Sequence, residues 1–460
     1  MKVYLVGGAV RNKLLNIPIH DRDYVVVGST PEEMLNLGYK QVGNEFPVFL
    51  HPETGEEYAL ARKEISTGDG YKDFKFIFTP DITLKEDLER RDFTINALAQ
   101  DIETGEIIDY VHGLHALENR KIAHINFMHF KEDPLRVLRA CRFICQLKRF
   151  TLAQSTEGLC REMVEEKMLD ALTPERVWKE VEKALRTPYF YKFIEKLDDI
   201  NALYKIFPEV YALKGVPENP KYHPEANTYK HLILVLKQVQ KFAKCLDEEQ
   251  LGLLNFALLC HDLGKQLSLR SSWPAHHGHE SLASDYIVGM SARLKIPNNY
   301  VRFAKLFAEN HMRFYEYIKQ QTKTHYDFLY NTTKFKSENE WKLNLMIIAH
   351  TCDLYGRQGE ISQDRKDRCY DTYKLIMQEF NILKDKTLKD LPEEIQLRLQ
   401  KYKGYEFGKL YRDAMISYLK NGLHRRLYKN CKDLLLGESF RDCPHYENVE
   451  ECWKEYNKEK

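Results

Sequence analysis

LVGGAVR, residues 5–11, and HDRDYVVV, residues 20–27, form the stretch that decides the fold of this chain. A short apolar strand ends in paired glycines, a helical segment follows, and a second strand begins with two aspartates. Because alternate residues of a strand share a face, Asp21 and Asp23 point the same way. Two close carboxylates repel each other unless a cation lies between them, and such hard oxygen ligands favour Mg²⁺. The paired glycines let a phosphate approach the start of the helix, so the stretch predicts a metal-dependent nucleotidyl transfer site.

Length and composition limit what the rest of the chain can be. A chain of 460 residues predicts two to four domains. The balance of 69 basic and 68 acidic residues confines any nucleic-acid surface to a local patch. The ten cysteines lack paired spacing, which predicts reduced thiols in a cytoplasmic protein. No apolar run approaches the roughly 18 residues that span a bilayer, so we expect no membrane partner.

Residues 1–125 mix strand and helix patterns and predict an α+β head domain. Residues 41–51 and 57–62 have the patterns of two strands. In the second strand, alternation makes Glu57 a candidate third carboxylate beside Asp21 and Asp23. Glu56 is the competing candidate, and an ordinary edge-strand glutamate is the alternative interpretation.

Residues 84–100 (LKEDLERRDFTINALAQ) are predicted to form one helix with a polar group, Arg90, Arg91 and Asp92, beside Asn96. Adjacent arginines usually mark a solvated face. Here the apolar residues that follow favour a polar cluster fixed against a core. Such a cluster suits a triphosphate and a ribose.

From about residue 126 the patterns are helical, and residues 132–143 (EDPLRVLRACRF) are the most informative. Asp133 is the expected N-cap, with Pro134 at the first helical position. Arg136, Arg139 and Arg142 recur along one stripe of this helix. A basic solvated face is the simplest interpretation of that stripe.

The start of this helix also predicts a choice of base. Asp133 and Arg136 lie one turn apart and can offer an acceptor and a donor to one planar partner. A carboxylate accepts from the exocyclic amine of cytosine or adenine, and a guanidinium donates to the neighbouring ring nitrogen. Uracil and guanine carry a carbonyl oxygen where that amine would be, so the pair predicts acceptance of CTP and ATP and refusal of UTP and GTP. Arg139 and Arg142 are then candidates for phosphate or base contacts, and residues 173–180 are expected to brace the helix.

A second set of metal-binding residue types follows residues 211–227, a Pro-, Gly- and Asn-rich loop that predicts a domain boundary. The set consists of His231, the adjacent pair His261 and Asp262, and Asp353. Single histidines in helical proteins are more often structural, but this arrangement is typical of a divalent ion site. Imidazole favours a transition metal over Mg²⁺, and among Ni²⁺, Mn²⁺, Co²⁺ and Zn²⁺ we expect Ni²⁺.

Three nearby residues are candidates for supporting roles. Lys265 can neutralise a phosphate, and His279 and His311 can support a second ion or the substrate. From about residue 356 the chain stays helical, with basic and tyrosine side chains that suit an RNA backbone. A solvated helical bundle explains these side chains equally well, and the residues from Cys431 onward predict nothing specific.

With these motifs in this order, the chain resembles the bacterial class II tRNA nucleotidyltransferases, the CCA-adding enzymes, in the multifunctional form with a fused HD phosphohydrolase domain. The resemblance covers residues 1–355 and weakens toward the C-terminus. It implies a polymerase-β-like head at residues 1–125 and a helical neck with a templating helix at residues 126–215. An HD domain at residues 220–355 and a helical tail at residues 356–460, which contacts tRNA, would follow.

The resemblance also implies an activity. The enzyme would add or repair the 3′-terminal CCA of tRNA from CTP and ATP without a nucleic-acid template, with Mg²⁺ held by Asp21 and Asp23. The residues that match the family's nucleotide contacts are Gly8, Arg11, Arg91, Arg139 and Arg142, with Asp92 in the same cluster, while Asp133 and Arg136 match its protein template. The HD set implies phosphatase, 2′-nucleotidase and 2′,3′-cyclic phosphodiesterase activities. We expect a monomer or a homodimer.

One residue departs from the family's first motif, because Asn12 stands where aspartate is usual. An aspartate there would orient Arg11 through a charge-assisted hydrogen bond, and asparagine accepts more weakly. We expect a reduced grip on the triphosphate without loss of activity.

Two alternatives to CCA addition share part of this evidence. A poly(A) polymerase, or an enzyme that adds only CC or only A, would have the same head motifs, although the HD set favours the CCA-adding form. An RNA-binding factor with a degenerate site is the other alternative. The intact Asp21, Asp23 and Arg91 argue against it.

Overall fold

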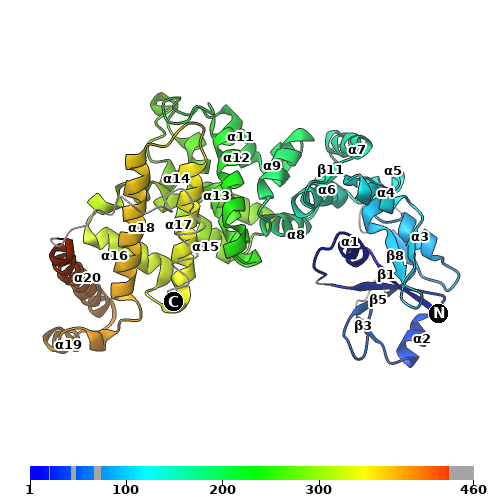
Figure 1. Cartoon of the computed structure of the whole chain (residues 1–460), viewed down its shortest axis with the longest axis horizontal. Coiled ribbons are helices and arrows are strands. Elements are labelled where there is room, and N and C mark those ends of the chain that lie inside the picture. Colours follow the sequence, from blue (N-terminus) through cyan, green and yellow to red (C-terminus); the bar gives the residue numbers. More distant parts are fainter. Residues whose placement is uncertain (20, 43–47, 67–73, 435–460) are drawn as a thin grey trace. The chain divides into compact units, whose positions relative to one another are not determined.

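The computed structural model describes residues 1–19, 21–42, 48–66 and 74–434, and it divides the chain into two compact units (Figure 1). The first unit contains Met1–Ala184 and Phe190–Pro208, and the second contains Leu185–Tyr189 and the chain from Glu209 onward. The expected head and most of the expected neck lie in the first unit. Residues 185–189 and 209–215 of the neck belong to the second unit, together with the expected HD domain and tail. The finer division into four domains stays a prediction. Within the described residues, no helix combines the length and apolar character needed to cross a membrane.

A seven-stranded mixed sheet forms the centre of the first unit. Its strand order is β3 (Lys40–Val42), β4 (Val48–Leu50), β5 (Glu57–Leu60), β2 (Asp23–Val27), β1 (Lys2–Val6), β8 (Leu98–Asp101) and β9 (Ile107–Asp109). β2 and β5 are parallel, and the other neighbours are antiparallel. The short pair β6 (Lys63–Ser66) and β7 (Phe74–Ile77) forms a separate ribbon.

Both faces of the sheet are covered, so neighbouring residues of one strand enter different cores. Val25 packs with residues of α3 (Leu84–Glu89), while Val26 packs with Met34 of α2 (Pro31–Asn36). Asp23 therefore shares the face of Val25, on the side of α3.

Two predictions of secondary structure in the head are wrong. Residues 84–100 form three elements: α3, the 3₁₀ turn η1 (Thr94–Asn96) and the sheet strand β8. The residues from Phe93 to Ala99 are all buried, so their apolar pattern does not distinguish a helix from a strand. The single strand predicted at residues 41–51 is instead the antiparallel pair β3 and β4, with residues 43–47 outside the described residues.

The short parallel pair β10 (Lys121–Ile122) and β11 (Thr151–Leu152) and a set of helices complete the first unit. These helices are α1 (Gly8–Leu14), α4 (Gly113–Glu118), α5 (Phe127–Glu132), α6 (Leu135–Gln146), α7 (Gln154–Glu165), α8 (Pro174–Leu185), α9 (Phe190–Asp199) and α10 (Leu203–Ile206). The predicted helix at residues 132–143 corresponds to α6. It begins one residue later than predicted, at Leu135, and Asp133 still accepts a hydrogen bond from the Leu135 amide at 3.1 Å.

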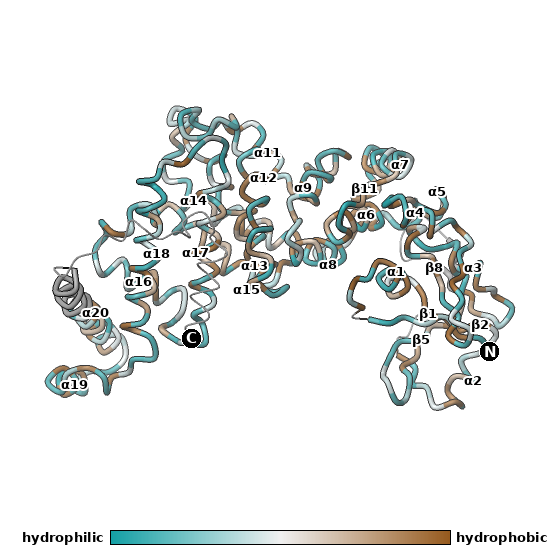
Figure 2. The backbone as a smooth tube through the Cα atoms, viewed as in Figure 1, coloured by the Kyte–Doolittle hydropathy of each residue, from teal (hydrophilic) through white to brown (hydrophobic). Residues whose placement is uncertain are grey.

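The second unit is helical throughout its described residues. Its main helices are α12 (Thr228–Gln238), α13 (Glu248–Cys260), α14 (His279–Leu294), α15 (Asn298–Asn310), α16 (Thr322–Thr333), α17 (Glu340–Tyr355), α18 (Gln363–Leu383), α19 (Glu393–Leu399) and α20 (Gly404–Leu434). α13 and α17 are largely buried and form its hydrophobic centre (Figure 2). Gly264 follows α13 at a close approach to α14, where a Cβ would lie 2.0 Å from the His279 carbonyl oxygen. This approach fixes the end of α13 against the start of α14.

Candidate functional site

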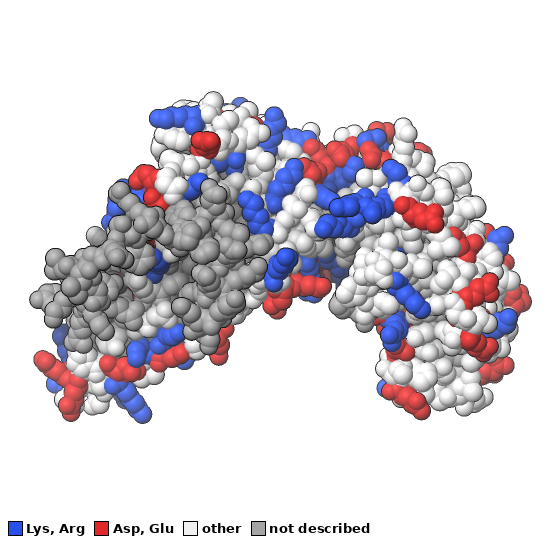
Figure 3. Space-filling model, in the orientation of Figure 1, with Lys and Arg blue, Asp and Glu red and all other residues white. Residues whose placement is uncertain are grey.

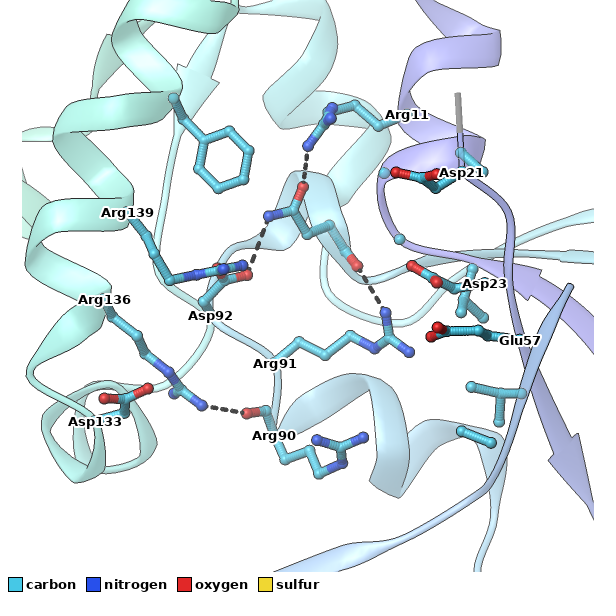
Figure 4. Close-up of a pocket in the computed structure, with 18 of the residues that line it drawn as sticks. Arg11, Asp21, Asp23, Glu57, Arg90, Arg91, Asp92, Asp133, Arg136 and Arg139 are labelled. Carbon is cyan, nitrogen blue, oxygen red and sulfur yellow. Dashed lines mark hydrogen bonds and ion pairs between the residues drawn. The ribbon is translucent and has the colours of Figure 1, made fainter. Parts of the chain in front are cut away.

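A cavity of about 760 Å³ opens in the first unit (Figure 4). Its walls come from the start of α1, the strands β2 and β5, the end of α3, and the helices α6 and α8. The predicted residues that line it are Gly8, Arg11, Asp21, Asp23, Glu57, Arg91, Asp92, Asp133, Arg136, Arg139 and Arg142. Every residue predicted for the head site therefore lies at one cavity.

The strand register selects Glu57 over Glu56 as the third carboxylate. Asp23 is paired with Glu57 in the parallel ladder between β2 and β5, so both side chains lie on one face. Glu56 does not line the cavity and instead accepts from Arg22 at 3.2 Å. Figure 4 shows Asp21, Asp23 and Glu57 on the same side of the cavity.

The charges around Asp23 suit a cation. Burial raises the pKa of Asp23, while Arg91 opposes this rise and Asp21 adds to it. A carboxylate destabilised by burial and by a second carboxylate is stabilised when a divalent cation binds between them. The oxygen-only donor set fits Mg²⁺.

A glycine is required next to this cation site. Gly7 has a φ of +69°, and a Cβ at this position would lie 3.1 Å from Nη1 of Arg91. Any other residue would be strained and would press on the arginine that faces Asp23. The paired glycines thus allow both the sharp turn into α1 and the approach of Arg91.

Arg11 is held by two asparagines. Its Nη1 donates to Oδ1 of Asn96 at 2.5 Å, and its Nε and Nη2 donate to Oδ1 of Asn12 at 3.1 and 2.9 Å. The predicted contact between Asn12 and Arg11 is therefore present. Burial and the nearby Arg142 lower the pKa of Arg11 to about 10. A guanidinium in such surroundings is stabilised by an anionic ligand.

The arginine stripe of α6 is not a solvated face, so that interpretation is wrong. Arg136 and Arg142 are buried, and Arg139 is partly buried. Arg139 donates through Nε to Oδ2 of Asp92 at 2.7 Å, and Arg142 donates to Glu180 of α8 at 2.5 Å. Arg139 and Arg142 are thus stabilised by acidic partners on neighbouring elements.

Asp133 and Arg136 line the cavity but have separate partners. Asp133 forms an ion pair with Arg176 of α8 at 2.9 Å. Arg136 donates to two backbone carbonyl oxygens, of His129 at 2.6 Å and of Arg90 at 3.0 Å. The helix at residues 173–180 thus supplies partners to α6, through Arg176 and Glu180, and Arg176 also lines the cavity.

Asp87 is a residue of this site that the sequence reasoning missed. It is completely buried and accepts from Arg90 at 2.6 Å and from Arg91 at 3.1 Å. Burial alone would raise the pKa of Asp87, but the two arginines outweigh burial and lower it to about 2. The signal in the sequence was the spacing. Asp87 precedes Arg90 by three residues and Arg91 by four, and on a helix an acid at these spacings can form ion pairs with both arginines.

The second unit brings together the predicted histidine and aspartate set. His231 lies on α12, His261 and Asp262 follow α13, and Asp353 lies on α17. Nε2 of His231 lies 3.1 Å from Oδ1 of Asp353, and Nε2 of His261 lies 3.2 Å from Oδ2 of Asp262. All four side chains are buried.

Each histidine of this cluster uses Nδ1 for a fixed acceptor. Nδ1 of His231 lies 3.1 Å from Glu225, and Nδ1 of His261 lies 2.7 Å from the Leu258 carbonyl oxygen. With Nδ1 as the donor in these contacts, each Nε2 is available to present a lone pair toward the centre of the cluster, as in metal-binding histidines. Nε2 of His261 and Oδ1 of Asp262 are buried and make no hydrogen bond with any described residue. Buried polar atoms without partners are costly, so the donor set fits a cation.

A second group shares Asp262. Nε2 of His279 and Nε2 of His311 lie 3.2 Å apart, at 3.4 and 3.6 Å from Oδ1 of Asp262. Their Nδ1 atoms face the carbonyl oxygens of His276 and Ala308. Two lone pairs at this distance repel each other unless a cation or a proton lies between them. These three residues therefore form a second candidate cation site.

The loop at residues 211–227 is part of this centre, not only a boundary. It contributes Glu218 and Glu225, both buried. Lys265, which we expected to face a phosphate, lies 2.8 Å from Glu218 and 2.9 Å from Asp262. Glu218 and Glu225 were missed because acids in a Pro- and Asn-rich segment are usually solvated.

Comparison with known proteins assigns the first unit to a class. Residues 3–123 match the family model described as the poly A polymerase head domain. Residues 149–213 match the model described as a probable RNA and SrmB-binding site of polymerase A. The chain is thus a nucleotidyltransferase head followed by a largely helical body.

Among solved structures, the whole chain is similar to CCA-adding enzymes. The apo form II of a CCA-adding enzyme is 20% identical, with 93% of this chain and 92% of that chain covered and a TM-score of 0.59. A complex of a CCA-adding enzyme with CTP is 22% identical, with coverage of 93% and 91% and a TM-score of 0.57. The Thermotoga maritima CCA-adding enzyme complexed with tRNA is 19% identical, with coverage of 92% and 91% and a TM-score of 0.57. The fold of this chain is that of the CCA-adding enzymes.

Proposed function

We propose that this protein adds and repairs the 3′-terminal CCA of tRNA from CTP and ATP without a nucleic-acid template. The observation that carries the proposal is the single cavity in which three carboxylates face Arg91 and the arginines of α6. Similar folds have been solved with CTP, with ATP and with tRNA, which supports the same substrates here.

In this proposal the carboxylates of the cavity bind the metal ion and its arginines bind the triphosphate. Mg²⁺ bound by Asp21 and Asp23 would supply the positive charge that activates the tRNA 3′-hydroxyl and stabilises the pyrophosphate leaving group. Glu57 adds a third carboxylate on the same face. Arg11 and Arg91 bind the triphosphate, each held in place by neighbouring side-chain or backbone oxygens.

Base selection falls to the start of α6. The Asp133 carboxylate accepts from the exocyclic amine of cytosine or adenine, and Arg136 donates to the adjacent ring nitrogen. For this, Arg136 must leave at least one of its two carbonyl partners, and the ion pair with Arg176 orients the Asp133 carboxylate. Asp133→Ala should blur the choice of CTP and ATP over UTP and GTP, while Mg²⁺ binding is unchanged.

Incubation with tRNA that lacks its 3′ end tests the proposal. Each nucleoside triphosphate is offered alone, then CTP with ATP, and the products are sequenced. The expected product ends in CCA. Long runs of A would indicate a poly(A) polymerase, addition of only CC or only A would indicate a partial enzyme, and no incorporation with Mg²⁺ would indicate an RNA-binding factor.

The second unit supports a second activity, metal-dependent hydrolysis of phosphate esters as in HD phosphohydrolases. The observation in its favour is the close pair of Nε2 atoms of His279 and His311 beside the His231, His261, Asp262 and Asp353 set. Asp262 would contact both cations, and imidazole ligands favour transition metals such as Ni²⁺. The expected activities are those of a phosphatase, a 2′-nucleotidase and a 2′,3′-cyclic phosphodiesterase.

Metal binding provides a test of this activity that does not need turnover. Titration with Co²⁺, followed by its absorbance, should show two equivalents bound through imidazole in the full chain and one in His311→Ala. The exposed His277 provides the matched control, because His277→Ala should leave both equivalents. Absence of imidazole-bound Co²⁺ in the unchanged chain would contradict the proposal.

A further inference from the structure

A second cavity, of about 520 Å³, lies in the second unit beside the histidine cluster. His279 and Lys265 of the cluster form part of its wall. Tyr315, Arg365 and Tyr222 complete it from three other segments of the chain. The cavity therefore connects the candidate metal centre to groups that none of the roles above uses.

Most charges at this cavity are neutralised by neighbours. Lys265 pairs with Glu218 at 2.8 Å, and Glu316 pairs with Lys319 at 2.8 Å. Arg368 pairs with Asp364 at 2.7 Å, and its side chain is 57% exposed. These groups have little net charge to offer a ligand.

Arg365 differs from its neighbour Arg368. Within the described residues, its guanidinium has no acidic partner and lies over the ring of Tyr315, 4.4 Å from the ring centre. The Tyr315 hydroxyl in turn donates to Oδ2 of Asp353 at 3.3 Å. Arg365 is thus a partly buried cation one tyrosine ring away from the candidate metal ligands. A partly desolvated guanidinium without a counter-charge is a strong site for a phosphate.

Tyr222 contributes an aromatic surface to the wall of this cavity. It is 49% exposed, in the loop before α12, and it lines the same cavity. An exposed tyrosine ring at a cavity stacks readily on the face of a base. The cavity therefore combines a cation next to the metal ligands with an aromatic surface open to solvent.

We propose that this cavity binds a nucleoside phosphate, with the phosphate against Arg365 and the base against Tyr222. The choice of a phosphate ester as the ligand rests on the phosphohydrolase activity proposed above. Arg365 acts as a positioning residue that holds the phosphate beside the histidine cluster. Arg368, although only three residues away on α18, has no such role because Asp364 already binds it.

Site-resolved chemical labelling tests the binding without turnover. The full chain is treated with phenylglyoxal, and modification of each arginine is followed by peptide mass spectrometry with and without 2′-AMP or inorganic phosphate. We expect 2′-AMP to slow the modification of Arg365 about fivefold or more and that of Arg368 less than about twofold. Tyr222→Ala should weaken protection by 2′-AMP but leave protection by inorganic phosphate. Equal modification of Arg365 with and without both ligands would overturn the proposal.

Kinetics separate this inference from the proposed activity. With a 2′,3′-cyclic nucleotide, Arg365→Ala should raise KM about tenfold with a smaller change in kcat, and Arg365→Lys should recover part of the loss. Arg302→Ala, which changes an exposed arginine of α15 that does not line the cavity, should match the unchanged chain. Hydrolysis with an unaltered KM in Arg365→Ala would refute the role of Arg365 and leave the phosphohydrolase standing. Protection of Arg365 in a chain that hydrolyses nothing would refute the phosphohydrolase and leave the binding site standing.

Discussion

Asn12 holds the Arg11 guanidinium through a neutral amide oxygen, where a carboxylate would hold it more strongly. Charge-assisted hydrogen bonds are roughly twice as strong as neutral ones, so Asn12→Asp should fix Arg11 more firmly. We expect this variant to lower the KM for CTP and ATP about fivefold, and Asn12→Ala to raise it about tenfold. Steady-state kinetics of CCA addition measure both. Lys13→Ala is the control, because the exposed Lys13 contacts Gln100 and does not line the cavity. The same KM in all three variants would contradict the role of Asn12.

The neighbouring glutamates of β5 provide a matched pair. Glu57→Gln should lower kcat for nucleotide addition about 100-fold or more, because it removes a carboxylate next to Asp23. Glu56→Gln should change kcat less than about twofold, because Glu56 is engaged with Arg22 on the surface. Single-turnover rates with saturating CTP distinguish the two variants. An equal loss in both would show that the strand register does not select the third carboxylate.

The sequence predicted those site residues that stand in a recognisable local motif. Asp21, Asp23 and Arg11 stand in a motif of paired glycines and aspartates, and all three line the cavity. Asp87 and Glu225 were missed because their function is to hold another residue. Their role depends on contacts between distant parts of the fold. A carboxylate in a polar segment is predicted to be solvated, and only the folded structure shows that it is buried.

Helix α3 makes the stability of the first unit depend on pH. The pKa of the buried Asp87 is about 2 in the folded chain, below its ordinary value of 3.8. The ion pairs with Arg90 and Arg91 therefore contribute fully above about pH 4, and this contribution, about 2 kcal/mol, is lost as the pH falls toward 2. Urea unfolding at pH 7 and pH 3 should show about half of this loss in the unchanged chain, because pH 3 lies between the two pKa values. Asp87→Asn should be less stable at pH 7 and should show a smaller further loss at pH 3.

The same helix supplies the control for that measurement. Glu89 is partly exposed and pairs only weakly with Lys85, at 3.7 Å. Glu89→Gln should leave the pH dependence as it is in the unchanged chain. An identical loss between pH 7 and pH 3 in Asp87→Asn would show that other carboxylates govern the acid sensitivity.

Helix α6 was predictable because Asp133 and Pro134 mark a helix start and the arginines recur at helical spacing, although most of its residues are buried. The segment from Phe93 to Ala99 is buried on all sides, so only its partners in the sheet, β1 and β9, determine that it ends as a strand. The position of β5 beside β2 is likewise a long-range pairing that no local pattern contains, and it decides which glutamate reaches the cavity.

At the scale of the whole molecule, two sets of polar residues lie in two compact units. The first cavity is lined only by residues of the first unit, and the histidine cluster belongs only to the second. Figure 3 shows acidic and basic side chains on the same face, in keeping with a formal net charge of +1. The RNA binding proposed above would therefore depend on a local arrangement of charge. Because the two sets lie in different units, the two proposed activities can differ in ligand and metal.

This division predicts that the two activities are separable in the full chain. Asp23→Asn removes a proposed Mg²⁺ ligand and should lower the proposed CCA addition at least about 100-fold, while release of phosphate from a 2′,3′-cyclic nucleotide changes less than about twofold. His261→Ala removes a ligand of the cluster and should have the opposite effect, because the two sites share no described residue. Both activities are measured on one preparation of each variant, with thermal unfolding to verify that the chain is folded. If either substitution in a folded chain abolishes both activities, the two sites are coupled. The two reactions would then share one centre or occur in an obligatory order, and the two units would not act independently.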